Sequence, residues 1–268
     1  QHQSLPLIIE NAELCLLVSL LFSMFSLSAH SLEQSVNSED RSSDNIVRDI
    51  YRHPYETLSF FGIKPQMTVV ELSPGGGWYT EILSIFAYDE GQLITAVYDP
   101  SKGGYYKRST DAFKNKLKSR DIYKKVEVVY LGSKLAPSGT VDAVLTFRNL
   151  HNWLGTEIET IFNQSFAALK PGGVFGVVEH RAMSGTSMEL MKKSGYVTEQ
   201  FAIGLALKTG FRLVAKSEIN ANPKDSKDHP KGVWTLPPSY RLGDKDYDKY
   251  SDLGESDRMT LLFQKPIN

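Results

Sequence analysis

The distribution of apolar and polar residues predicts that strands and helices alternate after residue 65. Short β-branched runs have the length and composition of strands, at residues 68–72, 93–98, 126–131, 141–147, 174–179, 212–219 and 259–263. Apolar positions recur at helical spacing between the earlier runs, at residues 78–88, 105–120, 157–169 and 196–207. Strands joined by crossover helices predict an α/β fold, with a mostly parallel sheet covered by helices on both faces.

A helical lead-in precedes this pattern. Residues 31–43 are polar and predict a flexible linker. From Asp44, apolar residues recur at roughly helical spacing until Gly62 and Pro65 end the pattern. The chain then divides into a signal-like segment (1–31), a linker with a helical lead-in (32–64) and an α/β domain (65–268).

The signal-like segment contains an apolar run at residues 14–27, followed by small residues up to Ser31. Its length is typical of a signal peptide and is short for a membrane span, although no Lys or Arg precedes Arg41. We expect export to the periplasm; the alternatives are an interfacial anchor, or a cytoplasmic protein whose start lies elsewhere. Cys15, the single cysteine, lies in this run, so an exported chain has no disulfide and no thiol nucleophile.

The balance of charges gives no indication of a nucleic-acid partner. The 30 Lys and Arg residues nearly balance the 31 Asp and Glu residues, and the formal net charge is −1. The basic residues are spread along the chain, so no basic block indicates nucleic-acid binding. We therefore expect a small-molecule partner, no nucleic acid, and no membrane contact beyond the export segment.

Residues 68–80 show the order strand, glycine turn and helix start (TVVELSPGGGWYT). Glycine lets the backbone approach a ligand, and the free N–H groups at a helix start face that ligand. Dinucleotide-binding folds use G-x-G-x-x-G, and Thr80 stands at the third glycine position, which disfavours a nicotinamide-dependent oxidoreductase. Asp99 closes the next strand, where a carboxylate can accept both ribose hydroxyls. The alternatives are a glycine turn without a ligand and an aspartate that opens a turn before Pro100.

Several landmarks occur in a fixed order along the chain: the segment from Glu71 to Gly77, Asp99, residues 141–144 (VDAV) and residues 168–173 (ALKPGG). In this order they resemble the class I S-adenosylmethionine-dependent methyltransferases. More narrowly, the chain resembles a bacterial family of predicted methyltransferases of unassigned substrate. That resemblance is carried by residues 51–54 (YRHP), 147–153 (FRNLHNW) and 232–238 (GVWTLPP).

The resemblance covers residues 44–266 and implies a Rossmann-like methyltransferase fold, with a seven-stranded, mostly parallel sheet whose last strand is antiparallel. It implies S-adenosyl-L-methionine as the cofactor, with Asp99 on the ribose hydroxyls and the glycine loop on the methionine and ribose parts. The implied cofactor-binding residues are Glu71, Ser73, Gly75, Gly76, Gly77 and Asp99. Ser73 departs from the usual first glycine, and residues 131–134 lack the acid that often contacts adenine.

Motifs that are absent from the sequence narrow the range of molecules that could accept the methyl group. No Asn/Asp-Pro-Pro-Tyr follows the strand at residues 141–147, and a mature chain lacks the cysteine that cytosine C5 methylation needs. Residues 147–149 offer no carboxylate where magnesium-dependent catechol-type enzymes place a metal ligand. We therefore expect a methyltransferase acting on a small molecule. An exported, non-catalytic binding protein that retains the fold is the alternative, because the cofactor is not expected to be plentiful outside the cytoplasm.

Polar residues gather at two predicted strand ends, where Arg148 and His151 follow one strand and His180 and Arg181 follow another. A sulfonium methyl is already activated, so the protein need only align the acceptor and remove its proton. We expect His151 or His180 as the base and Arg148 or Arg181 as the holder of an anionic acceptor. A structural role is the alternative for each.

Two further hypotheses concern this region. A metal site could combine His151, Glu179, His180 and His229, although their spacing matches no local metal motif. The proline-containing segment at residues 223–238 is long and irregular, which is typical of a lid or of a surface excursion.

Overall fold

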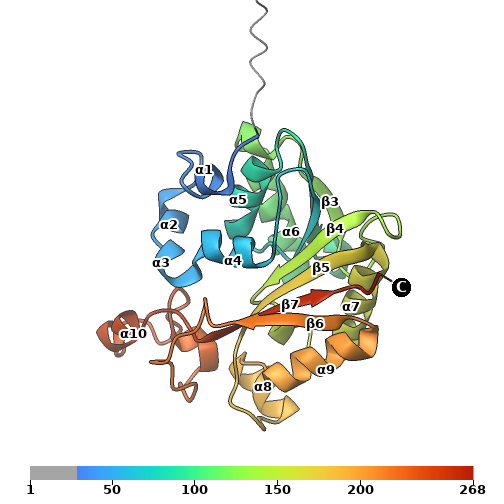
Figure 1. The fold of residues 1–268 in the computed structure, drawn as a ribbon. Helices are drawn as coiled ribbons and strands as arrows, with labels where there is room; N and C mark the ends of the chain where they lie inside the picture. Colours follow the sequence, from blue (N-terminus) through green and yellow to red (C-terminus); the bar gives the residue numbers. More distant parts are fainter. Residues whose placement is uncertain (1–28, 268) are drawn as a thin grey trace, which may run out of the picture.

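The computed structural model describes residues 29–267 (Figure 1). The apolar run at residues 14–27, with Cys15, lies outside the described residues, so the export segment remains a prediction. Among the described residues, no helix combines the length and apolar character needed to cross a membrane.

A seven-stranded sheet forms the centre of the molecule, with strand order β3-β2-β1-β4-β5-β7-β6 (Figure 1). The strands are β1 (Thr68–Leu72), β2 (Gln92–Val97), β3 (Glu127–Tyr130), β4 (Val141–Phe147), β5 (Leu169–His180), β6 (Arg212–Ser217) and β7 (Arg258–Gln264). β7 is antiparallel to β5 and β6, and the remaining pairs are parallel. The predicted fold class is confirmed, including the antiparallel last strand.

Helices cover both faces of the sheet. The helices that follow β1 in the chain are α5 (Trp78–Phe86), α6 (Gly104–Leu117), α7 (Thr156–Ala168), α8 (Met188–Ser194), α9 (Glu199–Thr209) and α10 (Tyr247–Leu253), and α10 lies beside the sheet (Figure 1). Val70 of β1 belongs to a core shared with α7 and α9, whereas its neighbour Val69 belongs to a core shared with α5. Because successive side chains of a strand point to opposite faces, the unbroken apolar run of β1 serves both cores.

The N-terminal lead-in consists of α1 (Leu32–Val36), α2 (Ser43–Ile46), α3 (Asp49–Arg52) and α4 (Pro54–Phe60). The prediction of a flexible linker at residues 31–43 is wrong, because this stretch contains α1. Ser31 and Gln34 form a capping box at the start of α1, and Val36 is buried. The buried Arg41 pairs with Asp49 through two hydrogen bonds, of 2.7 and 2.8 Å. A capping box and one ion pair therefore fix a stretch whose composition alone predicts flexibility.

Short 3-10 turns lie in four of the connections: η1 (Pro100–Lys102), η2 (Asp121–Tyr123), η3 (Leu150–Asn152) and η4 (Gly232–Thr235). The Leu-Lys-Pro-Gly-Gly turn, which resembles the family landmark, lies inside β5. There the pairing shifts, since Val141 is opposite Leu169 but Ala143 is opposite Val174. The landmark is therefore an irregularity in the strand and not a separate loop before it.

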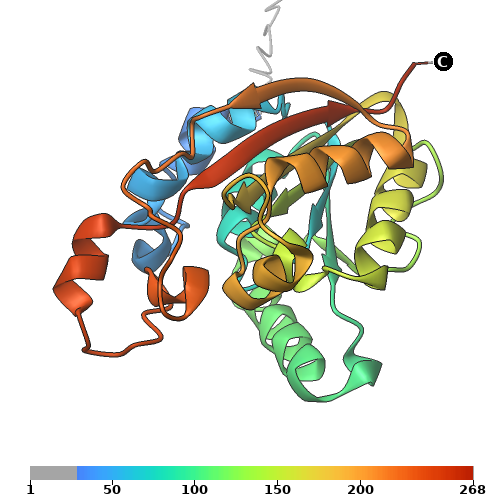
Figure 2. The same cartoon turned by 90° about the horizontal axis from the view of Figure 1, so that it is seen from below.

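The N-terminal helices and the start of β7 meet at the carboxyl edge of the parallel strands. Because β7 is antiparallel, its first residue lies at this edge, and Arg258 stands opposite His180 of β5. The segment between β6 and β7 lies beside the N-terminal helices (Figure 2). An ion pair of 2.6 Å between Arg48 and Glu255 joins the two parts. This edge is where open α/β sheets bind their ligands.

Candidate functional site

Two cavities lie at the carboxyl edge of the sheet. Cavity 1, of about 340 Å³, is lined by the glycine loop after β1, the residues after β4, His180 of β5, Arg258 of β7, the N-terminal helices and residues 233–239. Cavity 2, of about 330 Å³, is lined by residues that follow β2 and β3 and by α7. Residues far apart in sequence therefore share each cavity.

The glycine loop forms one wall of cavity 1. Ser73, Gly75 and Gly77 all have left-handed backbone angles, with φ of 45°, 58° and 77°. A Cβ atom on Gly75 or Gly76 would meet nothing within 4 Å, whereas one on Gly77 would lie 3.1 Å from the Lys116 side chain of α6. Gly75 and Gly76 therefore leave open space for a ligand, and Gly77 allows the helices to pack.

Ser73 stands at the usual first glycine position in a conformation that favours glycine. Its amide donates to Ala96 O at 2.8 Å, and its carbonyl accepts from Asn149 Nδ2 at 3.2 Å. These bonds from β2 and from the turn after β4 hold the loop in its conformation. Ser73 Oγ is buried and has no hydrogen-bond partner within residues 29–267.

Glu71 lies behind the loop, between β1 and α5, and is not among the residues that line cavity 1. Its Oε2 accepts from Thr80 Oγ1 at 2.6 Å. Burial raises the pKa of Glu71 to about 7, although Thr80, Lys116 and Arg148 oppose that rise. The geometry therefore makes Glu71 a support for the start of α5, and direct contact with a cofactor stays a prediction.

Asp99 lines cavity 2 and not cavity 1. Its carboxylate accepts from the Ser101 amide at 2.9 Å, and hydrogen bonding to Ser101 lowers the pKa of Asp99. An ionised carboxylate at this place is suited to accept hydrogen bonds from ribose hydroxyls. The structure thus places Asp99 at the expected strand end but in the second cavity.

Tyr98 stands between the two cavities. It lines cavity 2, and its hydroxyl is directed toward Ser73 of cavity 1 and toward Trp153. Burial raises the pKa of Tyr98, and these two neighbours partly offset the rise. Trp153 Nε1, like Ser73 Oγ, is buried without a hydrogen-bond partner in the described part of the chain. Ser73, Tyr98 and Trp153 therefore form a group of polar side chains between the two cavities, and of these three Ser73 lines cavity 1 and Tyr98 lines cavity 2.

His151 and Glu179 form a hydrogen-bonded pair at the back of cavity 1. His151 Nδ1 lies 3.0 Å from Glu179 Oε1, and Glu179 is fully buried. Glu179 also accepts from the backbone amides of His151, at 3.3 Å, and of His180, at 2.7 Å. A proton on Nδ1 that is donated to the carboxylate leaves Nε2 as the accepting nitrogen. The structure therefore fixes the ring of His151 through Nδ1, and its role as the base stays a prediction.

His180 lies beside His151, with ring centroids 5.2 Å apart, and also lines cavity 1. Its Nδ1 contacts Ser256 Oγ at 2.5 Å. Burial, together with His151 and nearby arginines, holds the pKa of His180 well below its usual range. His180 is therefore neutral at physiological pH, and the two predicted histidines lie together.

Four arginines and one glutamate line the same cavity, namely Arg48, Arg52, Arg148, Arg258 and Glu255. We call the four arginines the arginine cluster. Glu255 lies 2.6 Å from Arg48 and 3.2 Å from Arg52, and it also pairs with Arg258. Although burial alone would raise it, the four guanidinium groups hold the pKa of Glu255 well below its usual range.

Only Arg148 of this cluster was predicted as a site residue. Arg48 immediately precedes α3, Arg52 is the last residue of α3, and Arg258 is the first residue of β7. One local signal was available, since Arg48 and Arg52 are four residues apart in a helical pattern and therefore share a face. Nothing local indicates that Arg258 joins them.

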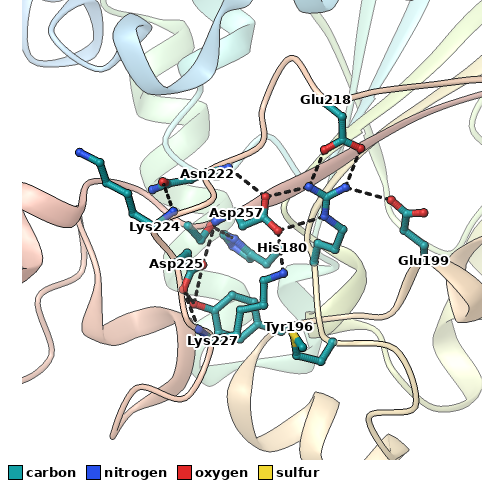
Figure 3. A network of polar contacts seen from close by, with 12 residues as sticks. His180, Tyr196, Glu199, Glu218, Asn222, Lys224, Asp225, Lys227 and Asp257 are labelled. Atoms are coloured by element: carbon teal, nitrogen blue, oxygen red, sulfur yellow. Dashed lines mark hydrogen bonds and ion pairs between the residues drawn. The ribbon is translucent and has the colours of Figure 1, made fainter.

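Arg181 does not line cavity 1. Its guanidinium donates to Asp257, Glu199 and Glu218, the carboxylates that Figure 3 labels. A guanidinium has five N–H donors, and these five hydrogen bonds use them all. The carboxylates also raise the pKa of Arg181 above its usual value. We therefore assign Arg181 to the packing of the segment after β6, and not to anion binding.

The same network anchors the proline-containing segment. Asp225 accepts from the Tyr196 hydroxyl at 3.1 and 3.0 Å, and Lys227 pairs with Asp257 at 2.8 Å (Figure 3). The segment carries Trp234, which packs edge to face with His151, with ring centroids 5.8 Å apart. It therefore forms a wall of cavity 1, and its movement as a lid stays a prediction.

The structure brings together only three of the four residues of the predicted metal site. His151, Glu179 and His180 offer atoms within 4.8 Å of one another, whereas His229 is bonded to Asp225 at 2.8 Å and lines a different cavity. Both oxygens of Glu179 already accept hydrogen bonds. The adjacent arginine cluster repels a cation, so the surroundings favour an anion.

Comparisons with solved structures find the same fold. An S-adenosylmethionine-dependent methyltransferase from Aquifex aeolicus is 16% identical, covers 88% of this chain and 99% of its own, and superimposes with a TM-score of 0.56. A geranyl diphosphate methyltransferase in complex with S-adenosylmethionine is 10% identical, covers 87% and 94%, and has a TM-score of 0.54. The [4+2]-cyclase SpnF is 15% identical, covers 88% and 92%, and also has a TM-score of 0.54.

The chain therefore has the fold of the class I S-adenosylmethionine-dependent methyltransferases. No protein-family model and no curated protein matches its sequence. The narrower resemblance to a bacterial family of predicted methyltransferases thus stays a prediction. Because one fold can host unrelated chemistries, as the cyclase illustrates, activity has to be inferred from the site.

Proposed function

We propose that this protein is an S-adenosylmethionine-dependent methyltransferase with a small-molecule acceptor. The observation that carries the proposal is cavity 1, where the open glycine loop after β1 faces the His151–Glu179 pair after β4 and on β5. A donor-binding loop and an oriented base in one cavity are the parts that methyl transfer needs.

The residues present fit the cofactor. Gly75 and Gly76 leave space beside the loop, and Ser73 and Tyr98 place two hydroxyl groups where cavity 1 meets cavity 2. Asp99 would accept the ribose hydroxyls in cavity 2, while the loop would hold the methionine part in cavity 1. When bound, the cofactor supplies a methyl group on a positively charged sulfur, which needs no further activation.

The chain's own residues would then align and deprotonate the acceptor. His151 Nε2 would accept the acceptor's proton, and Glu179 would stabilise the imidazolium through Nδ1. Trp234 shields the imidazole from one side. Neutral His180 would accept or donate one hydrogen bond without adding charge to the cavity.

Calorimetry of the full chain with S-adenosylhomocysteine tests cofactor binding. We expect binding, and a loss of about tenfold or more for Asp99→Ala, which removes charge-assisted hydrogen bonds. Asp121→Ala removes an exposed carboxylate from η2 and is the matched control. The absence of both heat and thermal shift would contradict the proposal, and equal affinities of the two variants would contradict the role of Asp99.

Turnover needs a separate measurement. His151→Asn should bind S-adenosylhomocysteine as the wild type does, yet transfer label from methyl-labelled S-adenosylmethionine to a small-molecule cell extract about 100-fold more slowly. An unchanged rate would exclude His151 as the base.

We also propose that the protein is exported. Determining the N-terminal residue of protein recovered from cells tests this proposal.

A further inference from the structure

Cavity 1 carries an excess of positive charge. Four guanidinium groups and one carboxylate line it, a formal excess of three positive charges. Counting the buried Glu179 beneath His151 still leaves an excess of two. Buried charges are normally paired, because desolvation of an unpaired ion is unfavourable by several kcal/mol. The imbalance therefore indicates that an anion belongs in this cavity.

Of the four arginines, Arg148 most clearly has N–H donors that could bind such an anion. Across residues 29–267, its guanidinium takes part in no hydrogen bond and no ion pair, and the half-buried residue lines cavity 1. Burial, together with Arg258 and Arg48, lowers the pKa of Arg148 to about 10, so the group remains charged at pH 7. Its five N–H donors are thus available to a ligand.

The backbone holds Arg148 in this position. Its φ of 62° is left-handed, a conformation that is unfavourable for a non-glycine residue. The amide donates to Val178 O at 2.7 Å, and the next residue, Asn149, is tied to Leu72 O at 3.1 Å. Strain of this kind persists where neighbouring contacts enforce it and is concentrated at functional sites.

The other arginines have donors to spare as well. Arg48, Arg52 and Arg258 all share the carboxylate of Glu255. Arg258 Nε is buried and has no partner among the described residues. One carboxylate cannot satisfy three guanidinium groups, and a second oxyanion would complete the set.

We propose that the arginine cluster binds the methyl acceptor through a phosphate or carboxylate group of that acceptor, which makes the acceptor an anionic small molecule. This inference rests on the proposed function. Methyl transfer would break the carbon–sulfur bond, with its electron pair going to sulfur, and form a bond from carbon to the acceptor's nucleophile. The nucleophile's proton would pass to His151 Nε2, while the oxyanion stays on the arginines.

The test uses the full chain and two probes, inorganic phosphate and succinate, titrated by calorimetry at pH 7 and constant ionic strength. We expect at least one probe to bind, and Arg148→Gln to weaken it about tenfold or more. Arg108→Gln removes an exposed arginine of α6 and should leave the affinity unchanged. A response to phosphate alone assigns a phosphate ester, and a response to succinate alone assigns a carboxylate.

A second variant should change the affinity in the opposite direction. Glu255→Gln removes the carboxylate that competes for the arginines, so the probe should bind more tightly, by about threefold or more. A merely structural role for these residues would lower affinity in both variants. If Glu255→Gln does not fold, the comparison of Arg148→Gln with Arg108→Gln decides.

Saturating S-adenosylhomocysteine separates the two proposals. Probe binding that persists beside it supports an acceptor site, whereas competition would assign the arginines to the cofactor's own carboxylate and overturn the inference. Failure of both probes, or equal affinities of Arg148→Gln and Arg108→Gln, also overturns it. If the probe binds but S-adenosylhomocysteine does not, the methyltransferase proposal fails and the anion site remains.

Discussion

At the scale of single residues, Glu71 shows how burial changes the chemistry of a familiar sequence position. The sequence places an acid at the end of β1, and the fold encloses it beneath α5. Burial raises its pKa from 4.5 to about 7, so the folded protein holds a proton that the unfolded chain releases. Stability contributed by this group therefore falls as pH rises from 4.5 to 7.

Glu71→Gln should remove this pH dependence. The amide retains an oxygen that accepts from Thr80, so we expect the variant to be more stable than the wild type at pH 8, by up to about 3 kcal/mol. The difference should fall to about 0.8 kcal/mol at pH 5. Urea unfolding at both pH values measures it, with Glu127→Gln, an exposed residue of β3, as the control. A stability difference that is equal at both pH values would contradict the raised pKa.

Arg148 and Arg181 look alike in the sequence, because each follows a predicted strand. In the fold, Arg148 lines cavity 1 and has no hydrogen-bond partner for its guanidinium in the described part of the chain, whereas three carboxylates use all the donors of Arg181. The carboxylates come from α9, from the segment after β6 and from the residue before β7. Partners so distant in sequence could not be assigned before the fold was known.

At the scale of elements, the segment from β6 to β7 forms a wall of the site although most of it has no regular structure. Gly232 begins η4 with a φ of 58°, and a Cβ atom there would lie 2.1 Å from Ser194 O of α8. Gly243 has nearly the same φ, 60°, but a Cβ atom there would meet nothing within 4 Å. A side chain at Gly232 would therefore meet both a steric clash and backbone strain, whereas a side chain at Gly243 would meet backbone strain alone.

Gly232→Ala should displace η4 from α8 and lower the free energy of unfolding by about 2–4 kcal/mol, through both strain and overpacking. Gly243→Ala should lower it by about 1–2 kcal/mol, through backbone strain alone. Chemical denaturation of both variants measures the difference. If both lose the same stability, the segment is not held by α8.

The lead-in was only partly predictable at this scale. Its helical periodicity identified a helical region, but composition predicted a flexible linker where α1 lies. Trp78 Nε1 of α5 donates to Asn45 O at 2.9 Å, and Arg52 lies over the Trp78 ring at 4.7 Å. Such contacts across the chain decide where short helices settle, because helices of this length are not stable alone.

At the scale of the whole molecule, the central sheet is packed so closely that some of its positions have no room for a side chain. Gly176 in β5 has no room for a side chain, since a Cβ atom there would lie 2.8 Å from both Leu145 and Phe61. Gly176→Ala should therefore lower stability by about 1–3 kcal/mol. Gly204→Ala, in open space on α9, should raise it by about 0.5–1 kcal/mol. Thermal unfolding of both checks the two opposite signs, and a gain for Gly176→Ala would contradict the packing described.

The sequence alone determined the alternation of strands and helices, the glycine loop after β1 and the acid at the end of β2. These are local, because periodicity, β-branching and glycine act within a few residues. Only the tertiary structure placed Asp99 and the loop in neighbouring cavities, paired His151 with Glu179 and assembled Arg48, Arg52 and Arg258 around Arg148. The physical reason is that strand order and the antiparallel β7 bring distant residues to one edge of the sheet. There, burial and charge decide which of them remain free to bind a ligand.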